Sequence, residues 1–452
     1  MSCLPRGSLR PSERPLGVMD CGMLSTDRVL RSIGHPDFET QTLVWLEGRL
    51  DRERLERGLG RLARRHPILS ARLDDRLAAR PVWRIPSEPA ATLHEVPLDE
   101  SSESAVHACA ARLLATPHDP ATADPMRFHL LRLPDGRDVF LVQYTHVLTD
   151  INAALPVLRE IDRLAAGSAG GDDSTSPDET DAVSNYLQRH SLRQRLTAAL
   201  RVLDLRFRSF RGGAVTLGGS EARETSRAPA PPVRFEMAAR SLSVDESQRV
   251  SARSAQICGV PSVSMALLAA AFRALGRHTS ERPLRRRSFL AGIGVDLGNR
   301  GRQSLAFQNL MSIVPLRAGW RDLDDYERLV RLLHEQFRSR LRNAADLGLL
   351  ELARFVSVRP RLADRTVRRV MLGGYSLWYA YFGSLDALGT EFCGTRVGNV
   401  YFTAPTWPPM GLTLLATQFR GRMHFATTSM PDLVPPATVD AFVETMLADV
   451  RS

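Results

Sequence analysis

The chain has 452 residues, of which 43% are hydrophobic and 24% charged, and this composition is typical of a folded globular protein. No apolar run reaches the length of a membrane-spanning helix, and residues 1–19 lack the apolar segment of a secretory signal, so we expect a cytoplasmic protein without a membrane span. The net charge of +10 comes from arginine alone, because the sequence contains no lysine, and the lack of zinc-finger, RNP or helix-turn-helix patterns argues against a nucleic-acid-binding protein.

The five cysteines are scattered along the chain and form no C-x-x-C pair. Their spacing indicates neither a structural zinc site nor a disulfide framework. We therefore expect reduced thiols and no bound metal.

The first informative segment is an alternating stretch at 43–50, which predicts a strand. It leads into a helix over 51–66 that Asp51 is placed to cap and Pro67 to end. Residues 68–73 then read as extended.

The most informative segment is the β-prone run 139–144, which ends abruptly at Thr145 and His146. Asp150 and Asn152 then offer N-caps for a helix that begins near Asn152. A histidine at the exit of a buried strand, with a carboxylate four residues on, is a candidate proton acceptor. The pattern by itself favours a satisfied histidine at a strand end, because chance matches are common among eleven histidines and fifty acidic residues.

Residues 166–180 form a polar Gly/Ser/Asp-rich linker, and 186–210 predict a basic helix with leucines among many arginines. The pattern favours packing of these leucines on the body of the protein over a contact with a membrane surface or a carrier protein. A second loose segment, 212–232, follows.

The remaining chain alternates predicted strands and helices, as expected for a mixed α/β lobe. Strands are predicted at 233–237, 412–419 and 423–428, and helices from 241, over 262–275, over 326–341 and from 439 to the C-terminus.

Two N-terminal stretches carry a family resemblance, namely Gly48-Arg-Leu-Asp-x-x-x-Leu55 and Leu62-x-x-Arg-His66-Pro-Ile-Leu69. They resemble the opening of the condensation-domain and CoA-dependent acyltransferase superfamily. This superfamily includes nonribosomal peptide condensation domains, polyketide-associated acyltransferases, wax ester synthases and alcohol acetyltransferases. The resemblance implies that His66 is a packing residue.

The family signature His-His-x-x-x-Asp-Gly resembles Thr145-His146-Val-Leu-Thr-Asp150-Ile151. The second histidine and the aspartate match, whereas threonine and isoleucine replace the first histidine and the glycine. The resemblance implies that His146 is catalytic and that Asp150 holds the loop. Because isoleucine is β-branched and cannot readily adopt a positive φ, the loop after His146 is expected to differ from the family's.

Later segments extend the resemblance and supply the other candidate site residues. Phe307-Gln-Asn309 resembles the family's glycine–asparagine turn, with Asn309 at the asparagine position. In the family an arginine pairs with the aspartate of the signature. Gly298 stands at its position here, and Arg300 and Arg302 follow as candidate partners of Asp150. The resemblance makes Thr145 and Asn309 candidates to line the cavity or stabilise an oxyanion, and Ser312 and Ser384 candidates to line a tunnel.

The resemblance implies an α/β fold of two chloramphenicol acetyltransferase-like lobes, each a mixed sheet flanked by helices, with an active-site tunnel between them. We expect a disordered leader at 1–19, an N-terminal lobe at 20–165, a linker and crossover with the basic helix at 166–232, and a C-terminal lobe at 233–452.

The resemblance also implies the activity. An acyl group would pass from a pantetheine thioester, on acyl-CoA or on an acyl or peptidyl carrier protein, to an alcohol or amine of a bacterial specialised (secondary) metabolite. His146 would act as general base, with no covalent intermediate and no covalently bound cofactor, in a monomeric enzyme.

Two alternatives stay open because the signature is partial. One is a degenerate or repurposed condensation-type domain that recruits partners or carries out a cyclisation. The other is an arginine-rich binding module for nucleic acid or a carrier protein.

Overall fold

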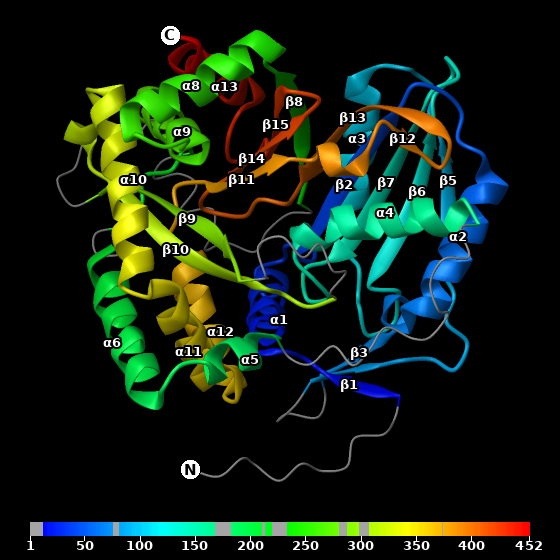
Figure 1. Cartoon of the computed structure of the whole chain (residues 1–452), viewed down its shortest axis with the longest axis horizontal. Helices are drawn as coiled ribbons and strands as arrows, with labels where there is room; N and C mark the ends of the chain where they lie inside the picture. The colour runs from blue at the N-terminus through cyan, green and yellow to red at the C-terminus, as the bar shows by residue number, and fades with distance from the viewer. Residues whose placement is uncertain are drawn as a thin grey trace.

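The computed structural model describes residues 12–75, 81–167, 182–209, 213–218, 233–279, 287–297, 307–372 and 374–452. These residues form two lobes, each built on a mixed sheet with helices against it (Figure 1). The expected fold class, a two-lobed α/β architecture, agrees with this arrangement.

The N-terminal lobe is built on a six-stranded sheet in the order β12-β13-β2-β7-β6-β5. Its strands are β12 (Glu391–Phe392), β13 (Thr395–Thr403), β2 (Glu39–Leu46), β7 (Asp138–Thr145), β6 (Met126–Arg132) and β5 (Leu93–Pro97). All neighbours are antiparallel except β5 and β6.

The central strand β7 is buried along its whole length because both of its faces are covered. Val139 and Leu141 pack with α3 (Glu103–Ala115). Phe140, Val142 and Tyr144 point to the other face, where α2 (Arg52–Arg65) and α4 (Ala154–Ala165) pack. This double coverage explains why the run 139–144 is continuously apolar apart from Gln143.

The C-terminal lobe contains a four-stranded sheet in the order β11-β14-β15-β8 and a hairpin of β9 and β10. Its strands are β11 (Trp378–Ser384), β14 (Leu412–Phe419), β15 (Arg422–Ser429), β8 (Glu236–Ser241), β9 (Phe289–Asp296) and β10 (Met311–Ala318), and its helices are α8 (Val244–Cys258), α9 (Val263–His278), α10 (Tyr326–Arg342) and α13 (Pro436–Arg451). Helix α9 is apolar on nearly every side because it lies within the core, between α13, α10 and the sheet.

The remaining elements join the lobes or flank them. They are α1 (Val18–Arg31), α5 (Ala182–Gln188), α6 (Leu192–Ser209), α11 (Ala345–Ser357), α12 (Pro360–Met371), the small sheet of β1 (Glu13–Pro15), β3 (Arg72–Asp74) and β4 (Val82–Arg84), and the 3₁₀ turns η1 (Pro67–Ser70), η2 (Ile151–Ala153), η3 (Trp320–Leu323) and η4 (Asp386–Leu388). In the part of the chain that the structure describes, no single helix is long and apolar enough to cross a membrane; only the pair α8 and α9, bent by 96°, passes that test by length and composition.

Two expected domain boundaries are wrong. Part of the expected leader, residues 1–19, is folded, because β1 pairs with β4 and α1 begins at Val18. The expected C-terminal lobe, 233–452, is not continuous in space either, because β13 pairs with β2 of the N-terminal sheet. Local sequence pattern does not reveal such pairings between segments far apart in the chain.

Two local predictions also need correction. The segment expected to be extended at 68–73 begins with the 3₁₀ turn η1. The expected helix 186–210 is divided into α5 and α6, and the residues that α6 buries include Ala198, Ala199 and Val202. Four leucines of α6 are at least half exposed, namely Leu192, Leu196, Leu200 and Leu203.

Gly348 on α11 marks the point where α6 crosses most closely. A Cβ at this position would lie 2.3 Å from the carbonyl oxygen of Ala198. Because that atom belongs to the backbone of α6, we expect Gly348→Ala to lower the free energy of unfolding by about 1–3 kcal/mol, despite the higher helix propensity of alanine. Gly22→Ala on α1 is the matched control, since nothing lies within 4 Å of its Cβ position; it should be neutral or stabilising by up to about 1 kcal/mol. Urea unfolding of both variants measures the difference, and equal midpoints would contradict the close crossing.

Candidate active site

His146 lies directly after β7, where the strand ends at the boundary between the lobes. Its backbone N–H donates to the carbonyl of Phe38 at 2.8 Å, and its ring stacks on the Phe38 ring with centroids 4.7 Å apart and an angle of 18°. The side chain is buried but still lines a cavity between the lobes. The strand and the stacked ring therefore fix both the position and the plane of the imidazole.

The side chain of Asn309 fixes the tautomer of His146. Its amide nitrogen donates to the His146 carbonyl at 2.9 Å and to Oδ1 of Asp20 at 2.8 Å, so its Oδ1 is the atom that faces Nδ1 of His146 at 2.9 Å. An amide oxygen only accepts, so Nδ1 must carry the proton and Nε2 must be the basic nitrogen. Nε2 makes no hydrogen bond within the described part of the chain.

Asp20 completes this chain of hydrogen bonds from the first turn of α1. Its Oδ1 also accepts from the backbone N–H of Asn309 at 2.8 Å, and its Oδ2 accepts from the N–H of Gly17 at 2.9 Å. Burial raises the pKa of this carboxyl to about 6, although the hydrogen bonds from Asn309 oppose the shift. Asp20, Asn309 and His146 thus form one line of hydrogen-bonded side chains that ends at the cavity.

Burial of the imidazole lowers the pKa of His146 to about 4. The ring is therefore neutral at pH 7, the state in which it can accept a proton.

We expect the ring NMR signals of His146, assigned with His146→Ala, to titrate with a midpoint near 4 instead of the ordinary value of about 6.5. Because only the unfolded chain binds this proton between those values, the contribution of His146 to stability should fall as pH drops below about 6.5. A midpoint near 6.5 would show that the ring is solvated.

Asp150 organises the loop that follows His146. Its Oδ1 accepts from the N–H of Asn152 at 3.0 Å, which caps η2, and its Oδ2 accepts from the N–H of Leu310 at 2.8 Å. These two bonds tie the loop to the segment that carries Asn309, and burial raises the pKa of Asp150 to about 6. Ile151 begins η2 and has no positive φ, so the isoleucine fits without the glycine's freedom.

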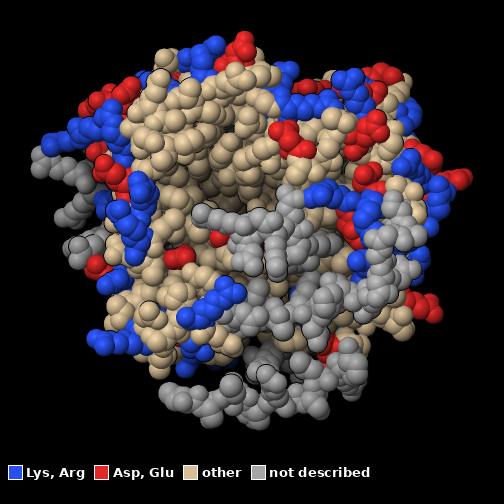
Figure 2. Space-filling view, in the orientation of Figure 1, with Lys and Arg blue, Asp and Glu red and all other residues tan. Residues whose placement is uncertain are grey.

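The cavity beside His146 has a volume of about 390 Å³ and receives side chains from both lobes. Its walls are mainly apolar and aromatic, with Phe38, Ile151, Met265, Ile313, Met311, Phe337, Trp378, Tyr381, Phe382 and Leu415 among the lining residues. Phe38 contacts the edges of Trp378 and Trp407, which hold its ring in place against His146. Figure 2 shows a hollow between the lobes on one face, with mostly uncharged walls.

This geometry agrees with the comparison to known proteins. The profile of the condensation domain matches residues 33–200. Over 98% of its length the chain superposes on 96% of the first condensation domain of the CDA synthetase, with a TM-score of 0.71 and 17% identity. The chain has the condensation-domain fold. The resemblance to condensation domains that the sequence predicts agrees with this profile match and with this fold.

The chain is also similar to part of a peptide synthase and, in fold, to an acetyltransferase. It is 29% identical over 131 residues to a plipastatin synthase of Bacillus subtilis (strain 168), a stretch that covers 29% of the chain and 5% of the synthase. It also superposes on the trichothecene 15-O-acetyltransferase of Fusarium sporotrichioides with a TM-score of 0.70 and 15% identity, covering 97% of this chain and 95% of the acetyltransferase. The matched stretch is thus a small part of the curated synthase.

The structure brings some of the site residues predicted from the sequence to one cavity and places others elsewhere. His146 and Asp150 line the cavity. Asn309 does not line it and contacts His146 at Nδ1. Thr145 does not line the cavity, because its hydroxyl turns back to accept from the N–H of Val147 at 3.3 Å. Arg300 lies outside the described residues.

Ser312 and Ser384, expected as tunnel-lining candidates, do not line the cavity beside His146. Ser312 points to the opposite face of β10, where its hydroxyl donates to the Asp346 carbonyl at 3.3 Å. Ser384 is exposed at the end of β11 and donates to Asp386 at 2.7 Å.

Sequence reasoning missed Asp20, Phe38 and Trp378. No motif marks them, and Asp20 stands one residue beyond the expected leader. The available signal for Asp20 was an acidic residue near the start of a helix. Such a residue predicts a helix cap equally well.

Proposed function

We propose that this condensation-type chain transfers an acyl group from a pantetheine thioester, on CoA or a carrier protein, to an alcohol or amine. The observation that carries the proposal is the imidazole of His146, held neutral at the cavity with Nδ1 bonded to Asn309 and Nε2 free. Condensation domains work on carrier-bound substrates in synthetases, and an acetyltransferase shares the fold, so both kinds of donor are retained.

In the proposed reaction, Nε2 of His146 takes the proton of the acceptor hydroxyl or amine as the acceptor attacks the thioester carbonyl. The tetrahedral intermediate then expels the sulfur, which takes the proton back from Nε2, so that an ester or amide and a free thiol are released. A positioned base of this kind contributes roughly 10²–10⁴-fold. Holding both substrates close together in the cavity supplies the remaining rate acceleration.

The cavity walls support an apolar acyl chain or acceptor. Aromatic and aliphatic side chains dominate around Trp378 and Ile313. Strand β9 contributes Gly292, and a larger residue there would collide with Ile313, because a Cβ would lie 2.7 Å from a methyl of that side chain. Apolar lining with a few fixed polar groups is the usual composition of a small-molecule site.

The proposal is tested by thioester turnover with acetyl-CoA, longer acyl-CoAs and a loaded carrier protein, each with a pooled set of alcohols and amines. Free thiol should appear only when both an acceptor and a donor are present, and intact-mass measurement should find no acylated protein. Thiol release without an acceptor, together with a stable acyl adduct, would contradict a direct transfer.

The repurposed-domain alternative is tested in the same assay. It predicts no acceptor-dependent thiol with any donor, together with retained binding of a carrier protein. The neutral, oriented ring of His146 favours the transferase, because a domain that only recruits partners has no need of a free Nε2 at an open cavity.

A further inference from the structure

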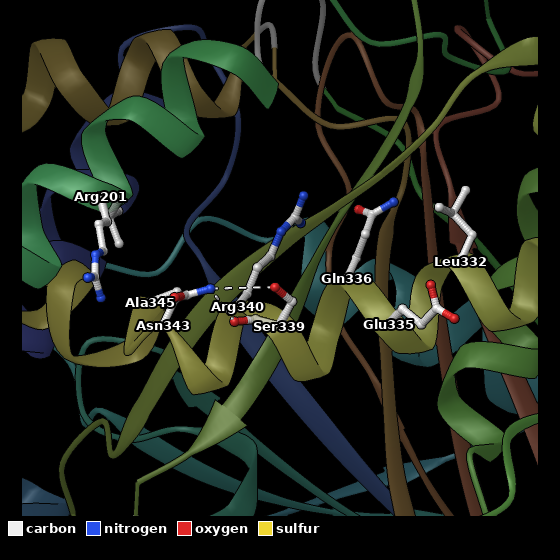
Figure 3. A pocket seen from close by; sticks show the side chains of 9 residues that line it. Arg201, Leu332, Glu335, Gln336, Ser339, Arg340, Asn343 and Ala345 are labelled. Carbon is white, nitrogen blue, oxygen red and sulfur yellow. Dashed lines mark hydrogen bonds between the residues drawn. The ribbon is translucent and has the colours of Figure 1, made fainter.

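A second cavity of about 570 Å³ lies between α6 and α10, on the C-terminal lobe. It shares no lining residue with the His146 cavity; Phe337 of α10 lines the first, whereas Gln336 and Arg340 line the second. Its other lining residues are Arg201, Val202, Leu332, Glu335, Ser339, Asn343 and Ala345 (Figure 3).

Arg340 is the unusual residue of this cavity. Its guanidinium makes no hydrogen bond or ion pair within the described part of the chain, and its Nη1 is buried without a partner. By contrast, the partly buried Arg195 on α6 is neutralised by an ion pair with Glu351, at a nitrogen–oxygen distance of 2.7 Å. Burial lowers the pKa of Arg340 to about 10, which leaves the group charged at neutral pH. A buried charge without a counter-ion is strongly unfavourable and calls for an anion.

The other lining groups suit an organic anion, in which a charged group is attached to a larger molecule. Figure 3 shows Arg340 extending from the middle of α10 and Arg201 extending from α6 toward Ala345, while Glu335 lies toward the Leu332 end. Arg201 has no described partner, so two guanidinium groups are available. Gln336 is already engaged, because its side chain bonds both the N–H and the carbonyl of Arg317.

We propose that this cavity binds the phosphate group of a small molecule, with Arg340 as the buried ligand and Arg201 as the second. The planar fork of the Arg340 guanidinium favours paired bonds to phosphate oxygens. Arg201 adds a second positive charge to the same cavity. The volume exceeds what free phosphate needs, so an organic phosphate with its body against Val202 and Leu332 also fits. The proposal is independent of acyl transfer.

The test is binding at constant ionic strength by calorimetry and by thermal unfolding, with inorganic phosphate, CoA, pantetheine (which lacks phosphate) and chloride as probes. Wild type should bind phosphate and unfold at a higher temperature in it than in chloride. Arg340→Gln should weaken this binding about tenfold or more, since it removes a charge-assisted contact. Arg338→Gln, which removes an exposed arginine of the same helix outside the cavity, should behave as wild type.

Thermal unfolding in chloride gives a second readout. Removing an unpaired buried charge should leave Arg340→Gln at least as stable as wild type. Loss of phosphate and CoA binding together would assign organic phosphate to the site, and loss of phosphate binding alone would assign free phosphate, with CoA held at the His146 cavity. Equal phosphate binding by wild type and Arg340→Gln, or none by either, would overturn the proposal.

Discussion

Replacing His146 with alanine is expected to reduce acceptor-dependent thioester turnover by roughly 10²- to 10⁴-fold, the usual contribution of a positioned general base. No other described side chain shares its position between the Phe38 ring and the cavity with a free ring nitrogen. Asp150 cannot replace it, because both of its carboxylate oxygens accept backbone N–H groups.

The measurement is kcat and KM for one donor and acceptor pair that wild type turns over, with unfolding temperatures to verify folding. KM should change little, because the lost interaction is made with the proton that moves in the transition state. His94→Ala, an exposed histidine on β5, is the control and should retain full turnover. Unchanged turnover in His146→Ala would remove this residue from the mechanism.

Replacing Asn309 with alanine is expected to lower kcat by roughly 10²-fold, with KM little changed, although Asn309 does not line the cavity. The change removes the side-chain oxygen that accepts from Nδ1 of His146 and one of the donors to Asp20. Without that acceptor the proton can move to Nε2, the nitrogen that has to be free for catalysis.

Asn309→Asp separates positioning from a general loss of structure. A carboxylate facing Nδ1 should raise the pKa of His146 from about 4 toward neutrality, so the acid limb of kcat/KM should move to higher pH. Asn399→Ala is the matched control, because Asn399 bonds Nδ1 of another buried histidine, His424, at 3.2 Å and away from the cavity. A pH profile unchanged in Asn309→Asp, or an equal loss of kcat in Asn399→Ala, would contradict the positioning role.

Local sequence pattern correctly predicted three elements whose conformation is decided within one segment. The run 139–144 became β7, Asp51 and Asp150 became helix caps with bonds of 3.0 Å, and the stripe from Val439 to Val450 is buried on α13. Each outcome depends on spacing within one element.

The same reasoning failed where burial depends on a distant partner. The leucines of α6 look like a core stripe, yet the close approach of α11 at Gly348 selects the small side chains Ala198 and Ala199 for the interface. Ser312 lies on β10, which lines the cavity through Met311 and Ile313, but its side chain is on the opposite face of the strand. The pairing of β10 with β9 in the folded protein sets which alternate residues line the cavity.

The sequence by itself determined the strand that delivers His146, the cap that Asp150 provides and, through the motifs, the resemblance to condensation-type proteins. Only the tertiary structure decided which nitrogen of the imidazole is basic. That choice requires Asp20, Asn309 and His146 to meet, although Asn309 lies 163 positions from His146 and 289 from Asp20. The physical reason is that a hydrogen-bonded tautomer depends on geometry within about 3 Å, whereas sequence periodicity reports only which face of an element is buried.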